Sequence, residues 1–160
     1  MAIVKYRVDS RMLHGQTCTA FGRFLHIDEY IVINEKVSKD QMQRTLLELA
    51  AMNSSVSICS PAEAKELIEN NELYGSQTMV VFKDIQDAVE LVKLGYHIDE
   101  LCIGGMFDEA GRNRIKYAIC LFVDDSDIEA FKYLEDQGVV LTHQVVPDYK
   151  ASSLKDLVKY

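Results

Sequence analysis

The 160-residue sequence has few of the features that mark secreted, membrane-spanning or multidomain chains. It holds no tryptophan and only two prolines, and it contains no Pro-, Ser- or Gly-rich tract that would serve as a linker and no internal repeat. No apolar run approaches the roughly 18 residues that cross a bilayer, and the strand-like run 2–8 begins without a secretion signal. We therefore expect one compact cytoplasmic domain covering residues 1–160.

The cysteines are few and scattered, and no two are separated by only two residues: Cys18, Cys59, Cys102 and Cys120. This spacing excludes zinc knuckles and thioredoxin-like redox sites and favours reduced, buried thiols. His14 and Cys18 have helical spacing, but a third or fourth metal ligand is not evident. We expect neither a metal ion nor a cofactor.

Excess positive charge is also lacking, because the formal net charge is -8. This balance argues against a nucleic-acid partner, which needs clustered Lys and Arg to neutralise phosphates. The charge is uneven, since residues 1–50 hold 7 Lys+Arg against 6 Asp+Glu, whereas residues 51–160 hold 10 against 19. Positive charge is concentrated around His14, which Arg7, Arg11 and Arg23 flank.

Short apolar, β-branched runs alternate with amphipathic stretches, and this pattern predicts a wound α/β domain. Several runs are apolar throughout, which is typical of a mostly parallel sheet with helices on both faces. The predicted strands are Ile3–Val8, Tyr30–Asn34, Ser55–Cys59, Thr78–Phe82, Glu100–Ile103, Ala118–Phe122 and Val139–Val145.

Helix starts are predicted from capping-box spacing at residues 38–41, 60–63 and 126–129. The first of these precedes Met42, Leu46, Leu49 and Ala50 at helical intervals. Further boundaries are predicted as follows: a first helix ending near Leu25, one from Asp84 to Gly95, one ending at Gly138, and a short helix from about Ser153 to Tyr160.

The loop after the first strand carries the residues best suited to chemistry. Ligands of open α/β sheets bind beyond the carboxyl ends of the strands, where residues 9–15 and the pair Gly104-Gly105 are expected. His14 lies at or just before a helix start, where unpaired backbone N–H groups favour an anion. Arg11 adds a planar cation for phosphate oxygens, and Gly15 lets the backbone come close. The loop thus predicts a histidine beside a phosphate site, although a structural histidine and a solvated arginine remain the alternative.

The supporting residues have two interpretations each. Asp9 either orients the guanidinium of Arg11 or caps the loop backbone. Gln16 either donates to phosphate or caps the helix. Gly104 and Gly105 either form a pocket wall that a phosphate can approach or make a tight turn after the strand.

The segment Arg7–Gln16 (RVDSRMLHGQ) resembles the active-site signature RIDDRLIHGQV of the enzyme IIB subunits of the mannose/fructose/sorbose family of the bacterial phosphoenolpyruvate-dependent sugar phosphotransferase system. Three further segments are similar to that family: 30–40 (YIVINEKVSKD), 102–106 (CIGGM) and 146–147. The resemblance covers essentially the whole chain.

The resemblance implies a seven-stranded α/β sheet and a phosphocarrier that acts as a protein-phosphohistidine sugar phosphotransferase. His14 would accept a phosphoryl group from the phosphohistidine of enzyme IIA, and Arg11 would bind the phosphate. The group would then pass to a sugar held by the membrane subunits IIC and IID, with the carrier peripherally associated with that transporter. A homodimer is left open.

Three positions depart from the family pattern: Ser10 replaces an Asp, Phe21 a Trp and Cys102 an Asn. Phe21 conserves bulk, whereas Ser10 and Cys102 remove polar groups near the expected site. Since His14 and Arg11 are kept, we expect an active carrier. The alternative is a catalytically altered member that acts as a regulatory or interaction protein.

Other classes that share an α/β fold lack their required residues. A receiver domain needs an Asp at the end of the third strand and a Lys after the fifth, where Cys59-Ser60 and Gly104-Gly105 stand. A cysteine phosphate loop needs five residues between Cys and Arg, but Arg23 follows Cys18 after four. A dinucleotide site needs a Gly-rich first loop, which contains only Gly15.

Overall fold

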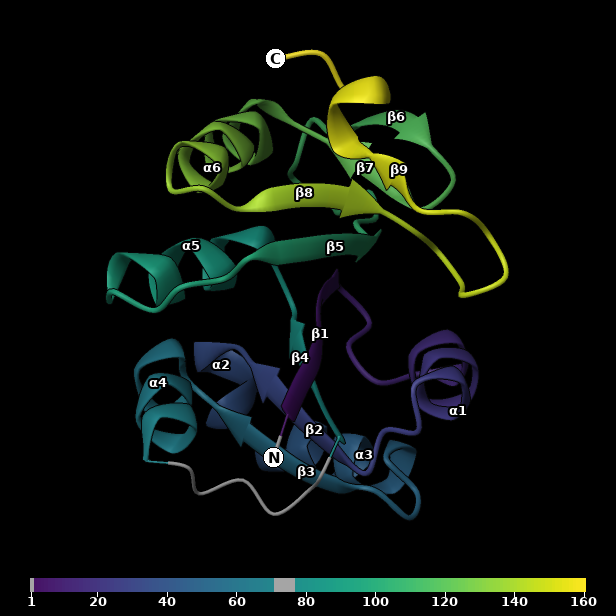
Figure 1. Ribbon diagram of the computed structural model, residues 1–160, viewed down its shortest axis with the longest axis vertical. Helices are drawn as coiled ribbons and strands as arrows, with labels where there is room; N and C mark the ends of the chain where they lie inside the picture. Colours follow the sequence, from purple (N-terminus) through teal and green to yellow (C-terminus); the bar gives the residue numbers. More distant parts are fainter. Residues whose placement is uncertain (1, 71–76) are drawn as a thin grey trace.

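A seven-stranded sheet runs through the computed structural model, which describes residues 2–70 and 77–160 (Figure 1). The strand order is β3-β2-β4-β1-β5-β8-β9, and all neighbouring pairs are parallel except β8 and β9. The predicted α/β domain with a mostly parallel sheet is therefore confirmed. The strands of this sheet are β1 (Ala2–Asp9), β2 (Glu29–Ile33), β3 (Ser55–Cys59), β4 (Gln77–Phe82), β5 (Glu100–Gly105), β8 (Val140–His143) and β9 (Ser152–Ser153).

Helices cover both faces of the sheet, as predicted. Residues of α4, α5 and α6 share one apolar cluster, and residues of η1 and α3 share a second cluster on the opposite side (Figure 1). The helical elements are the π-helix η1 (Gly15–Phe21), α1 (Gly22–Phe24), α2 (Glu35–Ser38), α3 (Gln41–Ala50), α4 (Pro61–Glu69), α5 (Ile85–Lys93), α6 (Asp125–Asp136) and the 3-10 helix η2 (Leu154–Asp156).

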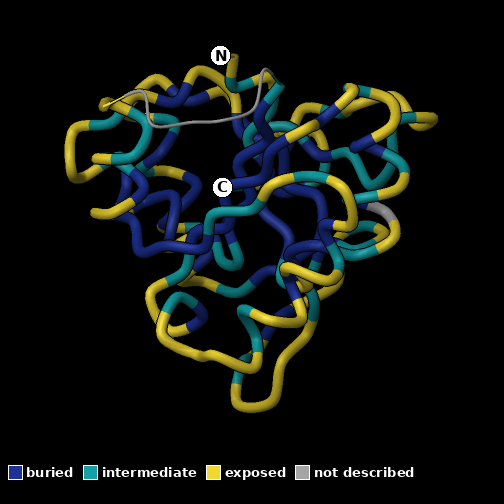
Figure 2. Tube along the Cα trace, turned by 90° about the horizontal axis from the view of Figure 1, so that it is seen from below, coloured by how far each residue is buried: buried dark blue, intermediate teal, exposed yellow. Residues whose placement is uncertain are grey.

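The central strands feed both clusters because side chains alternate along a strand. In β2, Ile31 and Ile33 join the first cluster, whereas Tyr30 and Val32 join the second. Buried chain occupies the middle of the molecule and exposed chain its loops and outer helix faces (Figure 2). This two-sided burial explains why these strands are apolar throughout.

The neighbours β1 and β5 place the two expected loops side by side. Asp9 pairs with Gly105 at the carboxyl end of this ladder, and the backbone N–H of Ser10 donates to the carbonyl of Gly105 at 2.8 Å. The loop after β1 therefore starts against the end of β5, as the position rule for open α/β sheets predicts.

The predicted strand Ala118–Phe122 is wrong. These residues lie in a separate antiparallel hairpin of β6 (Ile115–Ala118) and β7 (Leu121–Val123). Cys120 has a φ of 58°, in the left-handed region used by tight turns, and this turn breaks the apolar run. The seventh strand of the main sheet is instead the short antiparallel β9, and the predicted C-terminal helix is reduced to η2.

Two predicted helix caps are also wrong, because a nearby aspartate takes the capping position. Asp40 caps α3, since Ser38 still belongs to α2, and Asp124 rather than Ser126 forms the capping box of α6. The predicted capping box Ser60–Glu63 is confirmed. The boundaries at Asp84, Gly95 and Gly138 are confirmed too, and both glycines adopt positive φ.

The apolar face predicted for the helix after residue 41 points away from the core. Met42, Leu46 and Leu49 are 75%, 59% and 71% exposed, whereas Leu47 is buried in α3. The helix packs through Leu47 and the following Ala51. In the described part of the chain, no helix has the length and apolarity needed to span a membrane.

A buried carboxyl group in the first turn of α5 makes stability depend on pH. Asp87 accepts hydrogen bonds from the side-chain Nδ2 of Asn34 at 3.0 Å and from the backbone N–H of Asp84 at 2.9 Å. Burial nevertheless raises the pKa of Asp87 to about 6.

We predict that the free energy of unfolding of Asp87→Asn, relative to that of the wild type, increases as the pH rises from 4 to 7. Because the folded-state pKa is raised, stability from this group is present at low pH and is lost as the pH rises through about 6. Urea unfolding at each pH should show the difference in free energy of unfolding changing by roughly 1–3 kcal/mol. A difference that is constant with pH would contradict the raised pKa.

Candidate functional site

The loop after β1 turns sharply between Asp9 and the π-helix η1. The backbone N–H of Met12 donates to the carbonyl of Asp9 at 2.9 Å, which closes the turn. Met12 has a φ of 59°, a conformation that costs a non-glycine residue about 1–2 kcal/mol. Its side chain is buried in the second apolar cluster, which offsets that cost. His14 follows directly before η1, as predicted.

His14 is oriented by the carboxylate of Asp9. The Nε2 atom of His14 lies 2.7 Å from Oδ2 of Asp9, whose side chain is 1% exposed. The histidine side chain keeps 17% of its surface exposed. Because a carboxylate only accepts hydrogen bonds, this contact places the ring proton on Nε2. The imidazole is therefore held at the surface by a buried anchor.

Thr17 completes the contact from the first turn of η1. Its hydroxyl lies 3.1 Å from Nε2 of His14 and 3.5 Å from Oδ2 of Asp9, and its side chain is fully buried. The hydroxyl can donate to the carboxylate, and its oxygen shares the single Nε2–H proton, which is directed mainly at Asp9. The π-helix thus brings a second polar group to the same ring nitrogen, and single π-turns recur at functional sites.

The guanidinium of Arg7 lies behind Asp9 in the interior. It donates to the carbonyls of Gln144 and Val145 at 2.8 and 2.9 Å and to Oδ2 of Asp9 at 3.4 Å. It also stacks on the ring of Phe21, with Cζ 4.7 Å from the ring centroid. Arg7 is fully buried and supplies the positive charge that balances the buried Asp9.

Gly104 and Gly105 provide the space for this pair of charges. A Cβ atom on Gly104 would lie 1.9 Å from Cζ of Arg7, and one on Gly105 would lie 2.9 Å from Oδ1 of Asp9. Both glycines belong to β5 itself, so the alternative of a tight turn after the strand is wrong. Their described contacts are with Arg7, Asp9 and Phe107, and a role as a phosphate wall stays a prediction.

Arg11 is anchored through its backbone and stacked through its side chain. Its backbone N–H donates to Oδ1 of Asp9 at 3.1 Å, which agrees with the loop-capping interpretation of Asp9. Its guanidinium lies 4.5 Å from the centroid of the Phe107 ring. Arg11 is exposed and lies on the loop that carries His14.

The remaining predicted site residues differ in what the structure shows. Ser10 binds the end of β5 through its backbone N–H. Gly15 is exposed, and a Cβ atom added there would meet nothing within 4 Å. Packing within the chain therefore does not require a glycine at this position. The side chain of Gln16 lies outside what the structure describes, so its role stays a prediction.

Two of the three positions that depart from the family pattern, Phe21 and Cys102, lie against Arg7. Phe21 is 2% exposed and forms the ring face under Arg7, as expected for a packing residue. The Sγ atom of Cys102 lies 3.9 Å from NH1 of Arg7.

Burial raises the pKa of Cys18 to about 11, which keeps this thiol protonated at neutral pH. Cys18 is thus unsuited to be a thiolate nucleophile.

Sequence reasoning missed three residues of this arrangement. Thr17 carried a usable signal, since it stands three residues after His14 and so one turn along the predicted helix. Arg7 was noted only as a nearby charge, although its place inside an apolar strand next to Asp9 indicated a buried pair. Phe107 carried no local signal, because it reaches Arg11 only through the pairing of β1 with β5.

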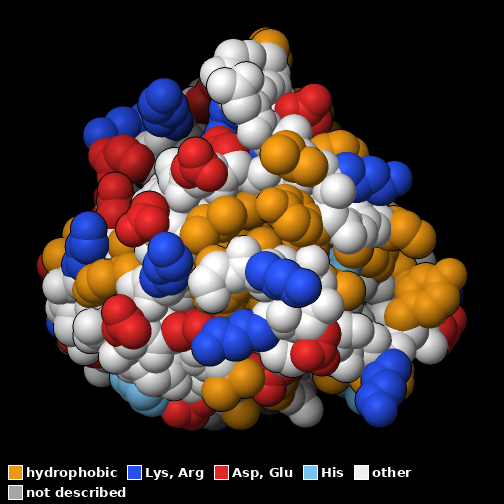
Figure 3. Space-filling view, turned by 90° about the horizontal axis from the view of Figure 1, so that it is seen from above, with side chains coloured by type: hydrophobic (Ala, Val, Ile, Leu, Met, Phe, Trp, Pro, Cys, Tyr) orange, Lys and Arg blue, Asp and Glu red, His pale blue; other side chains and the backbone are white. Residues whose placement is uncertain are grey.

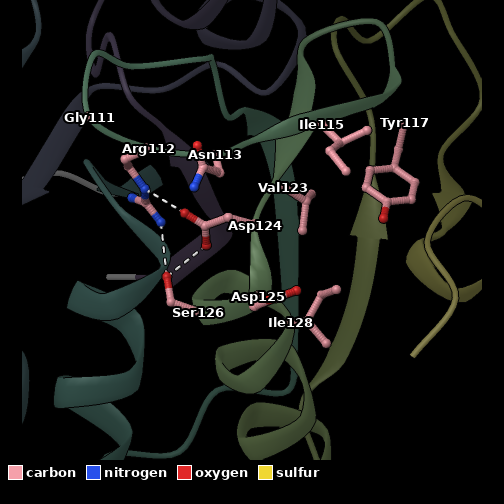
Figure 4. A pocket seen from close by; sticks show the side chains of 10 residues that line it. All are labelled: Gly111, Arg112, Asn113, Ile115, Tyr117, Val123, Asp124, Asp125, Ser126 and Ile128. Carbon is pink, nitrogen blue, oxygen red and sulfur yellow. Dashed lines mark hydrogen bonds and ion pairs between the residues drawn. The ribbon is translucent and has the colours of Figure 1, made fainter.

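A concave region lies between the loop before β6 and the start of α6 (Figure 4). Arg112 and Asp124 face one another on one side, and Ile115 and Tyr117 stand on the other (Figure 4). This end of the molecule also carries an apolar patch ringed by charged side chains (Figure 3). None of the predicted site residues lines this pocket.

Comparison with known proteins relates the whole chain to one family. A family model described as the PTS system sorbose subfamily IIB component matches residues 3–160. The sorbose-specific EIIB component of the phosphotransferase system of Lacticaseibacillus casei is 32% identical over 155 residues, which cover 96% of this chain and 93% of that protein.

Two further relatives extend the comparison. The mannose-specific EIIAB component of Escherichia coli (strain K12) is 29% identical over 159 residues, which cover 99% of this chain but 49% of that longer protein. The crystal structure of the IIBSor domain of the sorbose permease from Klebsiella pneumoniae superposes with a TM-score of 0.84 at 29% identity. The superposition covers 98% of this chain and 95% of that one.

The resemblance carried by residues 7–16 thus extends through sequence and fold along nearly the entire chain. Because the family model matches residues 3–160, we conclude that this protein belongs to the sorbose subfamily of IIB components of the phosphotransferase system.

Proposed function

We propose that His14 is the phosphorylated residue of this IIB component. Membership of the family gives the chain a phosphotransfer role in sugar uptake. The observation that carries the proposal is the 2.7 Å contact between Nε2 of His14 and the buried carboxylate of Asp9. Orienting a surface imidazole through one nitrogen is a common way to make the other nitrogen a nucleophile.

The same contact selects the reacting atom. Since Nε2 carries its proton toward Asp9, the lone pair of the neutral ring is on Nδ1. We therefore assign the attack on phosphorus to Nδ1 of His14. The P–N bond of the donor phosphohistidine breaks as the new bond forms, and the donor imidazole leaves. In the second step, a sugar hydroxyl attacks the phosphorus, the bond between phosphorus and Nδ1 breaks so that neutral His14 leaves, and the hydroxyl proton passes to water.

Arg11 is proposed to neutralise the charge of the phosphoryl group. Phosphoryl transfer needs alignment and charge stabilisation more than covalent help from the protein. The exposed guanidinium of Arg11 sits on the loop that carries His14, and its backbone is anchored to the carboxylate that orients the ring. Arg11 and His14 are thus both anchored to the carboxylate of Asp9.

Enzyme IIA is the proposed donor, and the membrane subunits IIC and IID with bound sugar are the proposed acceptor. The name of the mannose-specific EIIAB relative joins a IIA and a IIB component in one chain, which supports a IIA donor here. The exposed position of Arg11 and the partly exposed His14 fit a group that passes between proteins.

We predict that phosphorylated IIA labels this protein at one acid-labile site and that His14→Ala abolishes the label. His97→Ala is the matched control, because that histidine side chain is 67% exposed and lies outside the site. Mass spectrometry under alkaline conditions locates the group. Label that persists in His14→Ala would show that another residue carries the phosphoryl group, and absence of label from the wild type with a cognate donor would support the regulatory alternative.

We predict that Arg11→Ala slows transfer by about 100- to 1,000-fold, the usual effect of removing one charge-stabilising group. Single-turnover labelling with radioactive phosphoryl donor measures the rate, and circular dichroism checks the fold. Lys132→Ala removes one positive charge from α6 and should leave the rate unchanged. Equal rates for Arg11→Ala and the wild type would remove Arg11 from the site.

We predict that Asp9→Asn slows transfer by at least about 10- to 100-fold, the loss known for removing a carboxylate that orients a metal-bound histidine. An amide can offer an N–H group to Nε2 and so favour the ring proton on Nδ1, which removes the nucleophile. Nitrogen-15 NMR of His14 reports the tautomer directly. An unchanged tautomer together with an unchanged rate would show that Asp9 does not select the reacting nitrogen.

A further inference from the structure

The segment between β5 and β6 is closed into a loop by one buried arginine. NH1 of Arg114 donates to the carbonyl of Phe107 at 2.7 Å. A residue at the end of the loop therefore binds a residue at its beginning. The side chain of Arg114 is 2% exposed. An arginine enclosed to this degree is held by its partners rather than by solvent.

Arg114 is itself fixed by a carboxylate of α6. Its Nε and NH2 atoms donate to Oδ2 and Oδ1 of Asp127 at 3.0 and 3.2 Å, which is the two-pronged geometry that fixes a guanidinium plane. Asp127 is fully buried and also accepts from the backbone N–H of Asp124 at 2.9 Å. The start of α6 therefore sets the position of Arg114.

The carbonyl that Arg114 binds belongs to the residue on which Arg11 stacks. The Phe107 ring packs over Gly105, where an added Cβ atom would lie 2.9 Å from its Cε2. The same ring also contacts the guanidinium of Arg11, whose Cζ lies 4.5 Å from the ring centroid. Phe107 is thus clamped at its backbone and presents its ring to an exposed arginine.

We propose that Arg114 is a positioning residue for phosphoryl transfer, acting through Phe107 to hold the guanidinium of Arg11 beside His14. The inference rests on the proposed function of His14 and Arg11. An exposed arginine side chain samples many rotamers, and a fixed aromatic face restricts them. Transfer is then faster because the cation is already placed when the phosphoryl group arrives.

Arg114→Lys and Phe107→Leu should each slow single-turnover transfer from phosphorylated IIA by roughly 2- to 5-fold, the range expected for losing one exposed stacking contact. Phe107→Tyr keeps the ring and should restore the rate. Arg112→Lys is the matched control, since Arg112 also binds Asp127 but has no described contact with Phe107. In an Arg11→Ala background, neither substitution should slow transfer further, because the Phe107 ring then has no guanidinium to position.

Wild-type rates in both Arg114→Lys and Phe107→Leu would overturn the proposal. So would a loss of the same size in Arg112→Lys, or losses that persist in the Arg11→Ala background. Phe107→Leu keeps the test decisive if Arg114→Lys fails to fold.

A second measurement does not depend on transfer. The NMR signal of the Arg11 side-chain Nε–H group should carry a ring-current shift that Phe107→Leu and Arg114→Lys remove and Arg112→Lys retains. An unmoved signal in both variants would overturn the placement of Arg11. A wild type that accepts no phosphoryl group but shows these shifts would refute the proposed function while supporting the positioning by Arg114.

Discussion

The arrangement of the site depends on the buried guanidinium of Arg7. A charge in the interior is costly, and this one is stabilised by two carbonyls from the loop after β8, by the ring of Phe21 and by the carboxylate of Asp9. Among the described residues, its Nε atom has no hydrogen-bond partner, which costs about 1–3 kcal/mol. The benefit is that Asp9 can be buried as a carboxylate beneath a surface histidine. Gly104 is required because any side chain there would occupy the space of Arg7.

A buried anchor and an exposed reacting group suit a protein that exchanges a phosphoryl group with other proteins. Asp9 holds the His14 ring, the Arg11 backbone and the Thr17 hydroxyl, so one carboxylate fixes the loop that would meet the donor. A second buried carboxylate, Asp127, holds the opposite loop through Arg114. The position of each loop is thus fixed by charged side chains in the interior, where water does not compete for their hydrogen bonds.

Much of the fold could be predicted from the sequence because its signals are local. The apolar strands β2 and β4, the capping box at Ser60 and the glycine that ends α5 depend on neighbours in the chain. The errors arose where two local signals competed. Asp40 and Asp124 displaced nearby serines as helix caps, and a left-handed turn at Cys120 split an apolar run into a hairpin. Propensity does not say which of two adjacent candidates the tertiary fold selects.

By itself the sequence determined the alternation of strands and helices, the placement of His14 and Arg11 in the first loop, and the family of the chain, because each depends on residues close together along it. Only the tertiary structure decided what those residues touch. The pairing of β1 with β5 brings Gly104 to Arg7 and Phe107 to Arg11 across about a hundred residues of chain. The orientation of the His14 ring depends on the buried carboxylate of Asp9. Its charge is balanced by Arg7, which has space because the pairing of β1 with β5 places Gly104 next to it. Contacts between distant segments follow from packing of the sheet, and no local pattern encodes them.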